Sequence, residues 1–232
     1  MKSKSLTFIA EIGLNHNGNF GLFFELIKQA AIAGADYAKF QLGWRSGQGE
    51  INQLGHDELV LINKCCEYHE VKPLFSIFNQ EAWSLAKKFN FDAFKIASRT
   101  VVDNKSLVEE IIASGKITFV SLGMTDENTP FGIKDNVKYL WCKSEYPALP
   151  WCLTQLPKDF LKLSHEGYSD HSIGIEIPLI AIMRGATIIE KHFTLDKSDT
   201  TIRDHALSAS PSEFRQLVQL GRAMKRNLDI GV

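Results

Sequence analysis

Two lysines lie within short apolar runs of this sequence that are typical of buried strands. Lys39 lies in the run YAKFQ and Lys95 in the run AFKIAS. A lysine inside a core is costly unless it meets an anion, so the pair favours a site that grips a phosphate or a carboxylate. The alternative for either lysine is a side chain that reaches the surface or pairs with a buried glutamate.

Hydroxyl groups recur at the ends of the same kind of run. Hydroxyls donate hydrogen bonds to phosphate and carboxylate oxygens, so with the two lysines they strengthen the prediction of an anion site. The residues are Ser98, Ser121, Ser144 and Ser169.

Two histidines, His171 and His192, end two successive strand-like runs near the C-terminus. If these strands are neighbours, both imidazoles reach one divalent metal ion. Two nitrogens with a carboxylate, water or substrate oxygen suit manganese, iron or zinc better than calcium, and magnesium stays open. The alternative is that both histidines are structural.

Two glutamates accompany these histidines. Glu190 shares a strand face with His192 because side chains alternate, so Lys191 points the other way. Glu11 ends the first strand-like run. Two carboxylates beside two imidazoles are suited to moving protons around a bound metal. The alternative is that the glutamates are ion-pair partners of Lys39 and Lys95.

Strand-like runs alternate with helix-like stretches along the whole chain, a pattern typical of a parallel sheet built from βαβ units. The strands are predicted at 7–13, 37–42, 72–78, 93–98, 117–123, 137–144, 167–171 and 188–195, and the helices at 21–33, 57–70, 80–89, 104–114, 156–165, 176–184 and 211–227. Residues 126–136 hold Pro130 and Gly132 and no apolar stripe, so the fifth helix is predicted to be weak or missing. The prediction is an α/β fold, a (β/α)8 TIM barrel, whose loops after the strands gather at one rim.

Composition excludes several classes of protein. The chain has 232 residues, 44% hydrophobic and 23% charged, which predicts a single barrel domain over residues 1–232. Lys plus Arg number 26 against 27 for Asp plus Glu, so neither nucleic acid nor a membrane is a predicted partner. The four cysteines form no CxxC pair, and the N-terminus has no signal-peptide stretch, so we expect an unprocessed cytoplasmic protein.

The ordered set of motifs resembles the sialic acid synthases. These motifs are AEIGLNHNG at residues 10–18, KFQ at 39–41, KIAS at 95–98, SLGM at 121–124, SEYP at 144–147, YSDHSIG at 168–174, GATIIEKHFTL at 185–195 and DHALS at 204–208. The resemblance spans residues 8 to about 214, and the joint occurrence of the motifs in this order is specific.

The resemblance implies an enzyme that condenses phosphoenolpyruvate with N-acetylmannosamine or a related amino-sugar aldehyde, giving a sialic-type nonulosonic acid and phosphate. It implies that His171 and His192 bind Mn²⁺ or Mg²⁺ and act in catalysis with Glu11 and Glu190. The two lysines and four serines would hold phosphoenolpyruvate: Lys39, Lys95, Ser98, Ser121, Ser144 and Ser169. Three further residues would face the sugar: Gln41, Tyr146 and Asp204.

The implied chemistry assigns work to these groups. The enol carbon of phosphoenolpyruvate is a weak nucleophile, so the aldehyde needs polarising by the metal as a Lewis acid. Water then adds to the neighbouring carbon, with Glu11 or Glu190 managing the proton, and collapse of the tetrahedral centre expels phosphate.

The sequence departs from the family at its sugar side. Relatives usually continue into a C-terminal antifreeze-like domain that supplies an arginine to the partner subunit's sugar site, and that domain is absent here. We therefore expect a homodimer or a separately encoded lid domain, with Arg99 or Arg203 replacing the missing arginine. Two alternatives stay open: a non-catalytic barrel that binds phosphoenolpyruvate or a sugar acid, and a metal-dependent pyruvate aldolase.

Overall fold

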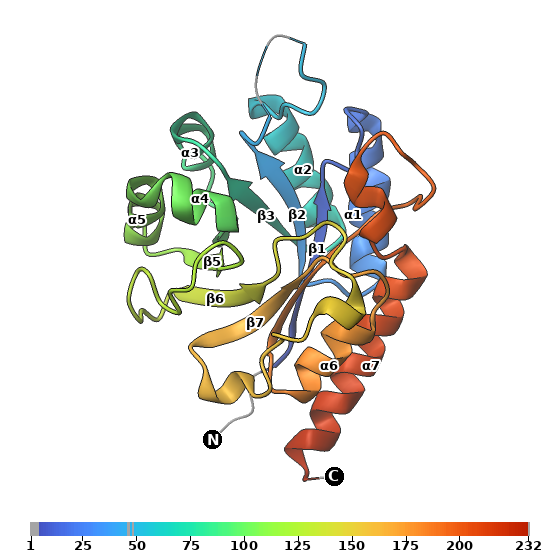
Figure 1. Cartoon of the computed structure of the whole chain (residues 1–232). Coiled ribbons are helices and arrows are strands. Elements are labelled where there is room, and N and C mark those ends of the chain that lie inside the picture. Colours follow the sequence, from blue (N-terminus) through green and yellow to red (C-terminus); the bar gives the residue numbers. More distant parts are fainter. Residues whose placement is uncertain (1–4, 46, 48, 232) are drawn as a thin grey trace.

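Eight parallel strands close into a barrel in the computed structural model, which describes residues 5–45, 47 and 49–231. Each strand pairs with the next along the chain, and β8 pairs with β1. The strands are β1 (Thr7–Gly13), β2 (Tyr37–Leu42), β3 (Lys72–Ile77), β4 (Ala93–Ile96), β5 (Ile117–Ser121), β6 (Val137–Cys142), β7 (His165–Asp170) and β8 (Ile188–His192). The predicted TIM barrel is thus confirmed (Figure 1).

Helices cover the outside of the barrel (Figure 1). They are α1 (Phe23–Ile32), α2 (His56–Tyr68), α3 (Gln80–Ala86), α4 (Ser98–Asp103), α5 (Lys105–Ala113), α6 (Glu176–Met183) and α7 (Pro211–Asp229). The last of them begins at a capping box in which Ser210 and Glu213 each accept a hydrogen bond from the other's backbone N–H, with Pro211 in the first turn. Among the described residues, no helix is both long and apolar enough to cross a membrane.

The return from β5 to β6 holds no helix in the described residues, as predicted for 126–136. The predicted helix at 156–165 is wrong. Only the short 3-10 turn η3 (Phe160–Lys162) forms there, and the last residue of the predicted range already belongs to β7. Pro157 lacks an N–H and disfavours a helical residue before it. The N–H of Phe160 instead bonds the carbonyl of Arg184, 2.7 Å away at the end of α6.

Side chains that point into the barrel form two levels. The lower level is apolar and closes the barrel below: Ile9, Tyr37, Leu74, Ala93, Phe119, Leu140 and Ile188. Two residues further along several strands, the inward positions become polar, as at Glu11 after Ile9 and Lys39 after Tyr37. The charged side chains that point into the barrel, such as Glu11 and Lys39, therefore lie towards the carboxyl ends of their strands.

Candidate active site

A cavity of about 340 Å³ opens at the carboxyl ends of the strands. Every residue predicted for the site lines it: Glu11, Lys39, Gln41, Lys95, Ser98, Ser121, Ser144, Tyr146, Ser169, His171, Glu190, His192 and Asp204. The structure therefore brings the predicted residues together, while the role of each stays a prediction. The cavity is also lined by Trp44, Ser76, Phe78, Ala97, Arg99, Met124, Cys142 and Arg203.

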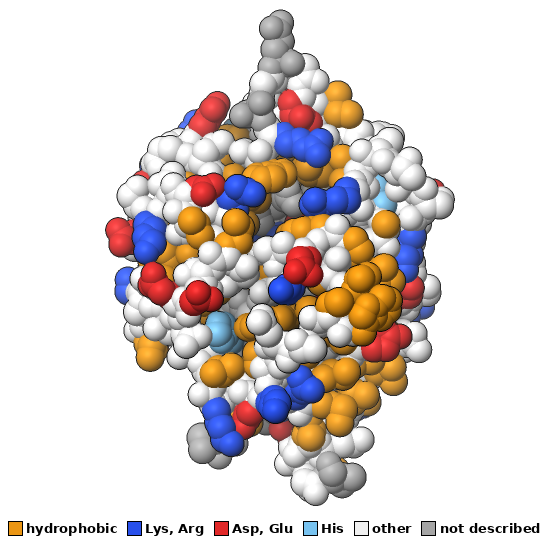
Figure 2. Space-filling model, viewed as in Figure 1, with side chains coloured by type: hydrophobic (Ala, Val, Ile, Leu, Met, Phe, Trp, Pro, Cys, Tyr) orange, Lys and Arg blue, Asp and Glu red, His pale blue; other side chains and the backbone are white. Residues whose placement is uncertain are grey.

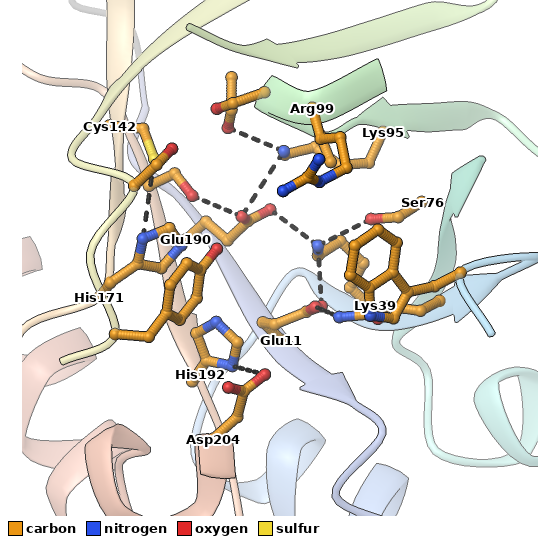
Figure 3. A pocket seen from close by; sticks show the side chains of 18 of the residues that line it. Glu11, Lys39, Ser76, Lys95, Arg99, Cys142, His171, Glu190, His192 and Asp204 are labelled. Carbon is orange, nitrogen blue, oxygen red and sulfur yellow. Dashed lines mark hydrogen bonds and ion pairs between the residues drawn. The ribbon is translucent and has the colours of Figure 1, made fainter. Parts of the chain in front are cut away.

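We call the buried charged residues Glu11, Lys39, Lys95 and Glu190 the floor of the cavity. The first lysine of this floor lies between the two carboxylates (Figure 3). The Nζ atom of Lys39 lies 2.8 Å from Oε2 of Glu11 and 3.4 Å from Oε2 of Glu190. It also donates a 2.9 Å hydrogen bond to Oγ of Ser76. This arrangement fixes one ammonium group at the centre of the floor.

The second lysine shares one of those carboxylates. Lys95 donates to Oγ of Ser121 at 2.8 Å and lies 3.7 Å from Oε1 of Glu190. Ser169 donates to the same glutamate oxygen at 2.7 Å. Glu190 thus bridges the two lysines (Figure 3). The lysines pair with buried glutamates, as the alternative interpretation proposed, and they also line the cavity in which an anion was predicted to bind.

Burial and nearby charges shift the pKa values of the two carboxyl groups of the floor in opposite directions. Burial raises the pKa of Glu11 above its usual range, and its proximity to Lys39 does not fully offset this. Burial also acts on Glu190, but Lys39 and Lys95 outweigh it and hold its pKa at about 2. Two carboxyl groups with separated pKa values can take different roles, one carrying a proton and the other staying ionised.

Burial and nearby charges also shift the pKa values of the two lysines, with opposite net results. Burial alone would lower the pKa of Lys39, but Glu11 and Glu190 outweigh it and raise the value. Burial lowers the pKa of Lys95, which has Glu190 as its main opposing charge. The two carboxylates thus favour the charged form of Lys39, whereas burial disfavours the charged form of Lys95.

The left-handed backbone at the end of β1 shapes this floor. Gly13 has a φ of +59°, and a Cβ there would lie 3.1 Å from Oε1 of Glu11 and 3.3 Å from Nε2 of Gln41. The amide of Gln41 donates a 3.0 Å hydrogen bond to the same glutamate oxygen. A glycine is therefore required for Gln41 to orient the Glu11 carboxyl group.

The two predicted imidazoles face each other above β7 and β8, with their ring centroids 5.5 Å apart. Nδ1 of His171 lies 2.8 Å from the carbonyl oxygen of Lys143, so Nδ1 is the donor, and Nε2 is the nitrogen that a metal would bind. Burial lowers the pKa of His192 to about 4, which leaves the ring neutral near pH 7. Its Nδ1 is buried and has no hydrogen-bond partner in the part of the chain that the structure describes.

These features fit a divalent cation, because metals bind neutral imidazole through a free nitrogen lone pair. Within residues 5–45, 47 and 49–231, however, no group of three or more His, Cys, Asp and Glu side chains forms a ready-made cluster for a metal. An ion held by His171 and His192 would therefore need water or substrate oxygens to complete its coordination.

The loop after β1 anchors the loop after β8. The side-chain amide of Asn15 donates to the carbonyl of Phe193 at 2.9 Å and to Oγ of Ser208 at 3.0 Å. Oδ1 of Asn17 lies 2.8 Å from Nε2 of His205. The NHNG and DHALS motifs thus work together to position Asp204, whose Oδ2 lies 3.9 Å from Nδ1 of His192.

Two predicted residues lie beyond their predicted strands. Ser98 is the first residue of α4 rather than the last of β4, and its Oγ accepts a 2.9 Å hydrogen bond from the N–H of Gly123. Ser144 lies in the loop after β6, which ends at Cys142. Both still line the cavity. Ser144 packs against Gly123, where a Cβ would lie 2.5 Å from its Oγ, and the hydrogen bond from Gly123 links Ser98 to the same loop.

Two residues beside the floor were missed from the sequence. Ser76 on β3 hydrogen-bonds Lys39, and its inward position follows from strand alternation two residues after Leu74. Cys142 lies with its sulfur 3.8 Å from Nδ1 of His171. Burial would raise the pKa of this thiol, but the nearby His171 and Lys95 outweigh it and lower the value.

Known proteins resemble the chain in sequence across nearly its whole length. The sequence model of the NeuB family matches residues 49–232. The N,N'-diacetyllegionaminic acid synthase of Campylobacter jejuni is 31% identical, over 99% of this chain and 79% of that protein. The human N-acetylneuraminate-9-phosphate synthase is 28% identical, over 95% of this chain and 70% of its own length.

A solved structure resembles the chain in fold as well. The N-acetylneuraminic acid (sialic acid) synthetase of Leptospira borgpetersenii, solved in complex with citrate, superposes with a TM-score of 0.90 and is 31% identical. The match covers 99% of this chain and 87% of that one.

Proposed function

We propose that this chain, which belongs to the NeuB family, condenses phosphoenolpyruvate with an amino-sugar aldehyde such as N-acetylmannosamine, giving a nonulosonic acid and phosphate. The observation that carries the proposal is the buried pair of ammonium groups, Lys39 and Lys95, bridged by Glu190 at the base of an open cavity. A phosphate and a carboxylate are the anions that such a floor is suited to bind.

In this proposal the lysines and serines hold phosphoenolpyruvate. Lys39 and Lys95 offset the negative charge of the substrate, and Ser121 and Ser169, already hydrogen-bonded on the floor, orient the lysines and their carboxylate. Ser98 adds a hydroxyl from the start of α4, and Ser144 adds one from the loop after β6. These groups would also stabilise the phosphate as it leaves, because donors preorganised in a buried site favour developing charge.

Glu11 is the proposed proton carrier of the reaction. Its raised pKa suits a group that exchanges protons with the water adding to C2 of phosphoenolpyruvate once the carbon–carbon bond has formed. As the tetrahedral centre collapses, one proton of that water ends on the former aldehyde oxygen and the other on the departing phosphate. Glu190, with a pKa of about 2, stays ionised and keeps the two lysines in place. Gln41, Tyr146 and Asp204 are proposed to face the sugar.

The metal is a further part of the proposal. His171 and His192 would hold Mn²⁺ or Mg²⁺, and such an ion would supply Lewis-acid polarisation of the aldehyde oxygen. Tyr146 stacks on His171, with their ring centroids 4.1 Å apart, and so limits the movement of that imidazole.

The mouth of the cavity needs a cover if water is to be controlled. The side chain of Arg203 is 67% exposed and that of Arg99 is 54% exposed, although both line the cavity. We propose that a second copy of the chain, in a homodimer, or a separately encoded lid closes this mouth. All four cysteines are free thiols, which fits the predicted cytoplasmic location.

An assay of phosphate release tests the proposed function. The protein, Mn²⁺ and phosphoenolpyruvate are incubated with a panel of aldoses, and the keto acid product is identified by mass. Acceptor-dependent release of one phosphate per keto acid is expected. Binding of phosphoenolpyruvate without turnover would favour the non-catalytic barrel, and release of pyruvate from a keto acid would favour the aldolase.

A further inference from the structure

Two arginines at the mouth of the cavity are each held over an aromatic ring. The guanidinium carbon of Arg203 lies 4.4 Å from the ring centroid of Tyr146, and that of Arg99 lies 5.8 Å from the ring of Trp44. Both distances are within the range of cation–π attraction. Neither arginine belongs to the motifs by which the sequence resembles its family.

Stacking on an aromatic ring leaves the edge of a guanidinium group available. An arginine has five N–H donors in one plane, and a ring above or below that plane uses none of them. Among the described residues, Nε of Arg203 donates to Asp204 at 3.3 Å, and Arg99 forms an ion pair with Asp103 at 3.9 Å. Most of the donors of both groups are therefore open to a ligand.

The mouth also differs from the floor in its balance of charge. On the floor, Lys39 and Lys95 face Glu11 and Glu190, so that two cations meet two carboxylates. At the mouth, Asp204 lines the cavity beside the two arginines, while Asp103, the partner of Arg99, lies outside the described lining, and both arginines are more than half exposed. Figure 2 shows Lys and Arg side chains bordering a hollow on this face, and Figure 3 shows Arg99 directed into the cavity.

The direction of the acceptor follows from the proposed function, on which this inference rests. The aldehyde must lie deep in the cavity, next to the phosphoenolpyruvate held by the lysines, so the opposite end of the sugar points to the mouth. We infer that Arg99 and Arg203 form a second anion subsite, and that the acceptor carries a phosphate ester or a carboxylate at the end remote from its aldehyde. Planar guanidinium groups are well matched to either anion.

Steady-state kinetics with matched acceptors test the inference. The panel is N-acetylmannosamine, its 6-phosphate and the corresponding uronic acid, each with saturating phosphoenolpyruvate and Mn²⁺. One of the two anionic acceptors is expected to have a kcat/KM at least about tenfold above that of the neutral sugar, and which one wins identifies the anion. Arg203→Ala and Arg99→Ala are each expected to lower this preference by about tenfold, mainly through KM for the acceptor.

Arg222→Ala is the matched control. This residue also holds its guanidinium over an aromatic ring, 5.7 Å from that of Phe8, but it lies on α7 and does not line the cavity. Its loss is expected to leave the preference unchanged. An equal or higher kcat/KM for the neutral sugar, or a preference that both mouth variants retain, would overturn the inference while leaving the synthase proposal intact.

A binding measurement separates the two proposals if no acceptor is turned over. Absence of phosphate release with all three acceptors counts against the proposed function. Calorimetric titration with N-acetylmannosamine 6-phosphate and the uronic acid then decides the subsite: loss of binding in both arginine variants, with binding kept in Arg222→Ala, supports it. Equal affinity of the three proteins for both anions, or no binding of either, overturns it.

Discussion

The floor and the mouth of the cavity are built from similar charged residues but in different ways. On the floor, Lys39 and Glu190 project from strands, and their side chains are 4% and 6% exposed. At the mouth, Arg99 and Arg203 project from the segments that follow β4 and β8, and more than half of each side chain is exposed. Buried charges interact strongly because water does not screen them, whereas exposed ones contribute little to stability.

The difference in burial between floor and mouth predicts a difference in how far each tolerates substitution. A buried cluster in which each charge depends on its neighbours tolerates little change, so it suits a step common to every substrate, here the binding of an anion. Exposed segments that follow the strands tolerate substitution, so they suit a choice between acceptors. We therefore expect floor variants to lose stability and turnover together, and mouth variants to change selectivity alone.

The largest effect is expected for Lys39→Met. The change removes the central ammonium group and leaves Glu11 and Glu190 facing each other in a buried site. We expect kcat/KM for phosphoenolpyruvate to fall by about 10²–10³-fold or more, and the free energy of unfolding to fall by about 3–5 kcal/mol. Phosphate-release kinetics and urea denaturation measure the two effects.

Lys72→Met is the control for that variant. Lys72 begins β3 and pairs with Asp92 at 2.9 Å on the exposed surface. Losing such a pair is expected to cost no more than about 1 kcal/mol and to leave kinetics unchanged. Turnover by Lys39→Met within a fewfold of the original would contradict the distinction between floor and mouth.

A second large effect is expected behind the floor, at Lys191. Its side chain is fully buried on the outer face of β8, as strand alternation predicts, and pairs with Asp170 at 2.8 Å. Tyr168 and Ser172 donate to the same carboxylate at 2.7 and 2.6 Å. Lys191→Met is expected to lower the free energy of unfolding by about 3–5 kcal/mol, because it leaves the buried carboxylate of Asp170 without its cation.

The double variant Asp170→Asn with Lys191→Met checks the cause. Removing both charges is expected to recover part of the lost stability, measured by urea denaturation of the single and double variants. Additive losses would mean that the two side chains contribute through packing rather than through their charges.

Acid is expected to destabilise the protein through the loop after β1. Burial lowers the pKa of His16 to about 4, and its ring packs among Phe20, Phe23 and Phe40. Between the ordinary pKa of 6.5 and about 4, the unfolded chain binds a proton that the folded chain does not. Stability is therefore complete above pH 6.5 and falls as the pH drops towards 4, by up to about 3 kcal/mol for this group.

Urea denaturation at several pH values measures this slope. In His16→Leu, the slope of the unfolding free energy against pH is expected to fall by the equivalent of about one bound proton. The variant also loses the 3.2 Å hydrogen bond from the N–H of Gly18, which affects stability at every pH. The variant His56→Asn removes an exposed histidine as a control. An unchanged slope in His16→Leu would assign the acid sensitivity to other groups.

The floor was predictable from sequence because strand geometry alone places it. Lys39 and Lys95 stand out as cations in apolar runs, and the two-residue alternation directs Glu190 and His192 inward and Lys191 outward. Segments outside the strands were harder to predict. The expected helix at 156–165 does not form, since tertiary contacts hold the segment at the end of α6, and α4 begins where a strand was expected.

The arginine–aromatic contacts at the mouth could not be predicted from the sequence, because they also join segments outside the strands. Arg99 and Arg203 were noticed as departures from the family, but their aromatic partners follow β2 and β6. No local spacing links an arginine to an aromatic residue on another loop, because that contact depends on how four loops fold over one barrel end. Ser76 and Cys142 lacked a distinguishing charge, although strand alternation would have found the serine.

The smallest effect is expected at the mouth, for Trp44→Ala. Trp44 is 42% exposed, packs against Phe78 with ring centroids 4.9 Å apart, and lies below Arg99. Losing an exposed cation–π contact of about 0.5–1 kcal/mol is expected to raise KM for the preferred acceptor by about two- to fivefold. The free energy of unfolding is expected to change by less than the loss in Lys39→Met. Trp44→Phe keeps a ring beneath the guanidinium and should recover most of the acceptor affinity. A variant that instead lost stability and turnover together would show that the mouth is as tightly coupled as the floor.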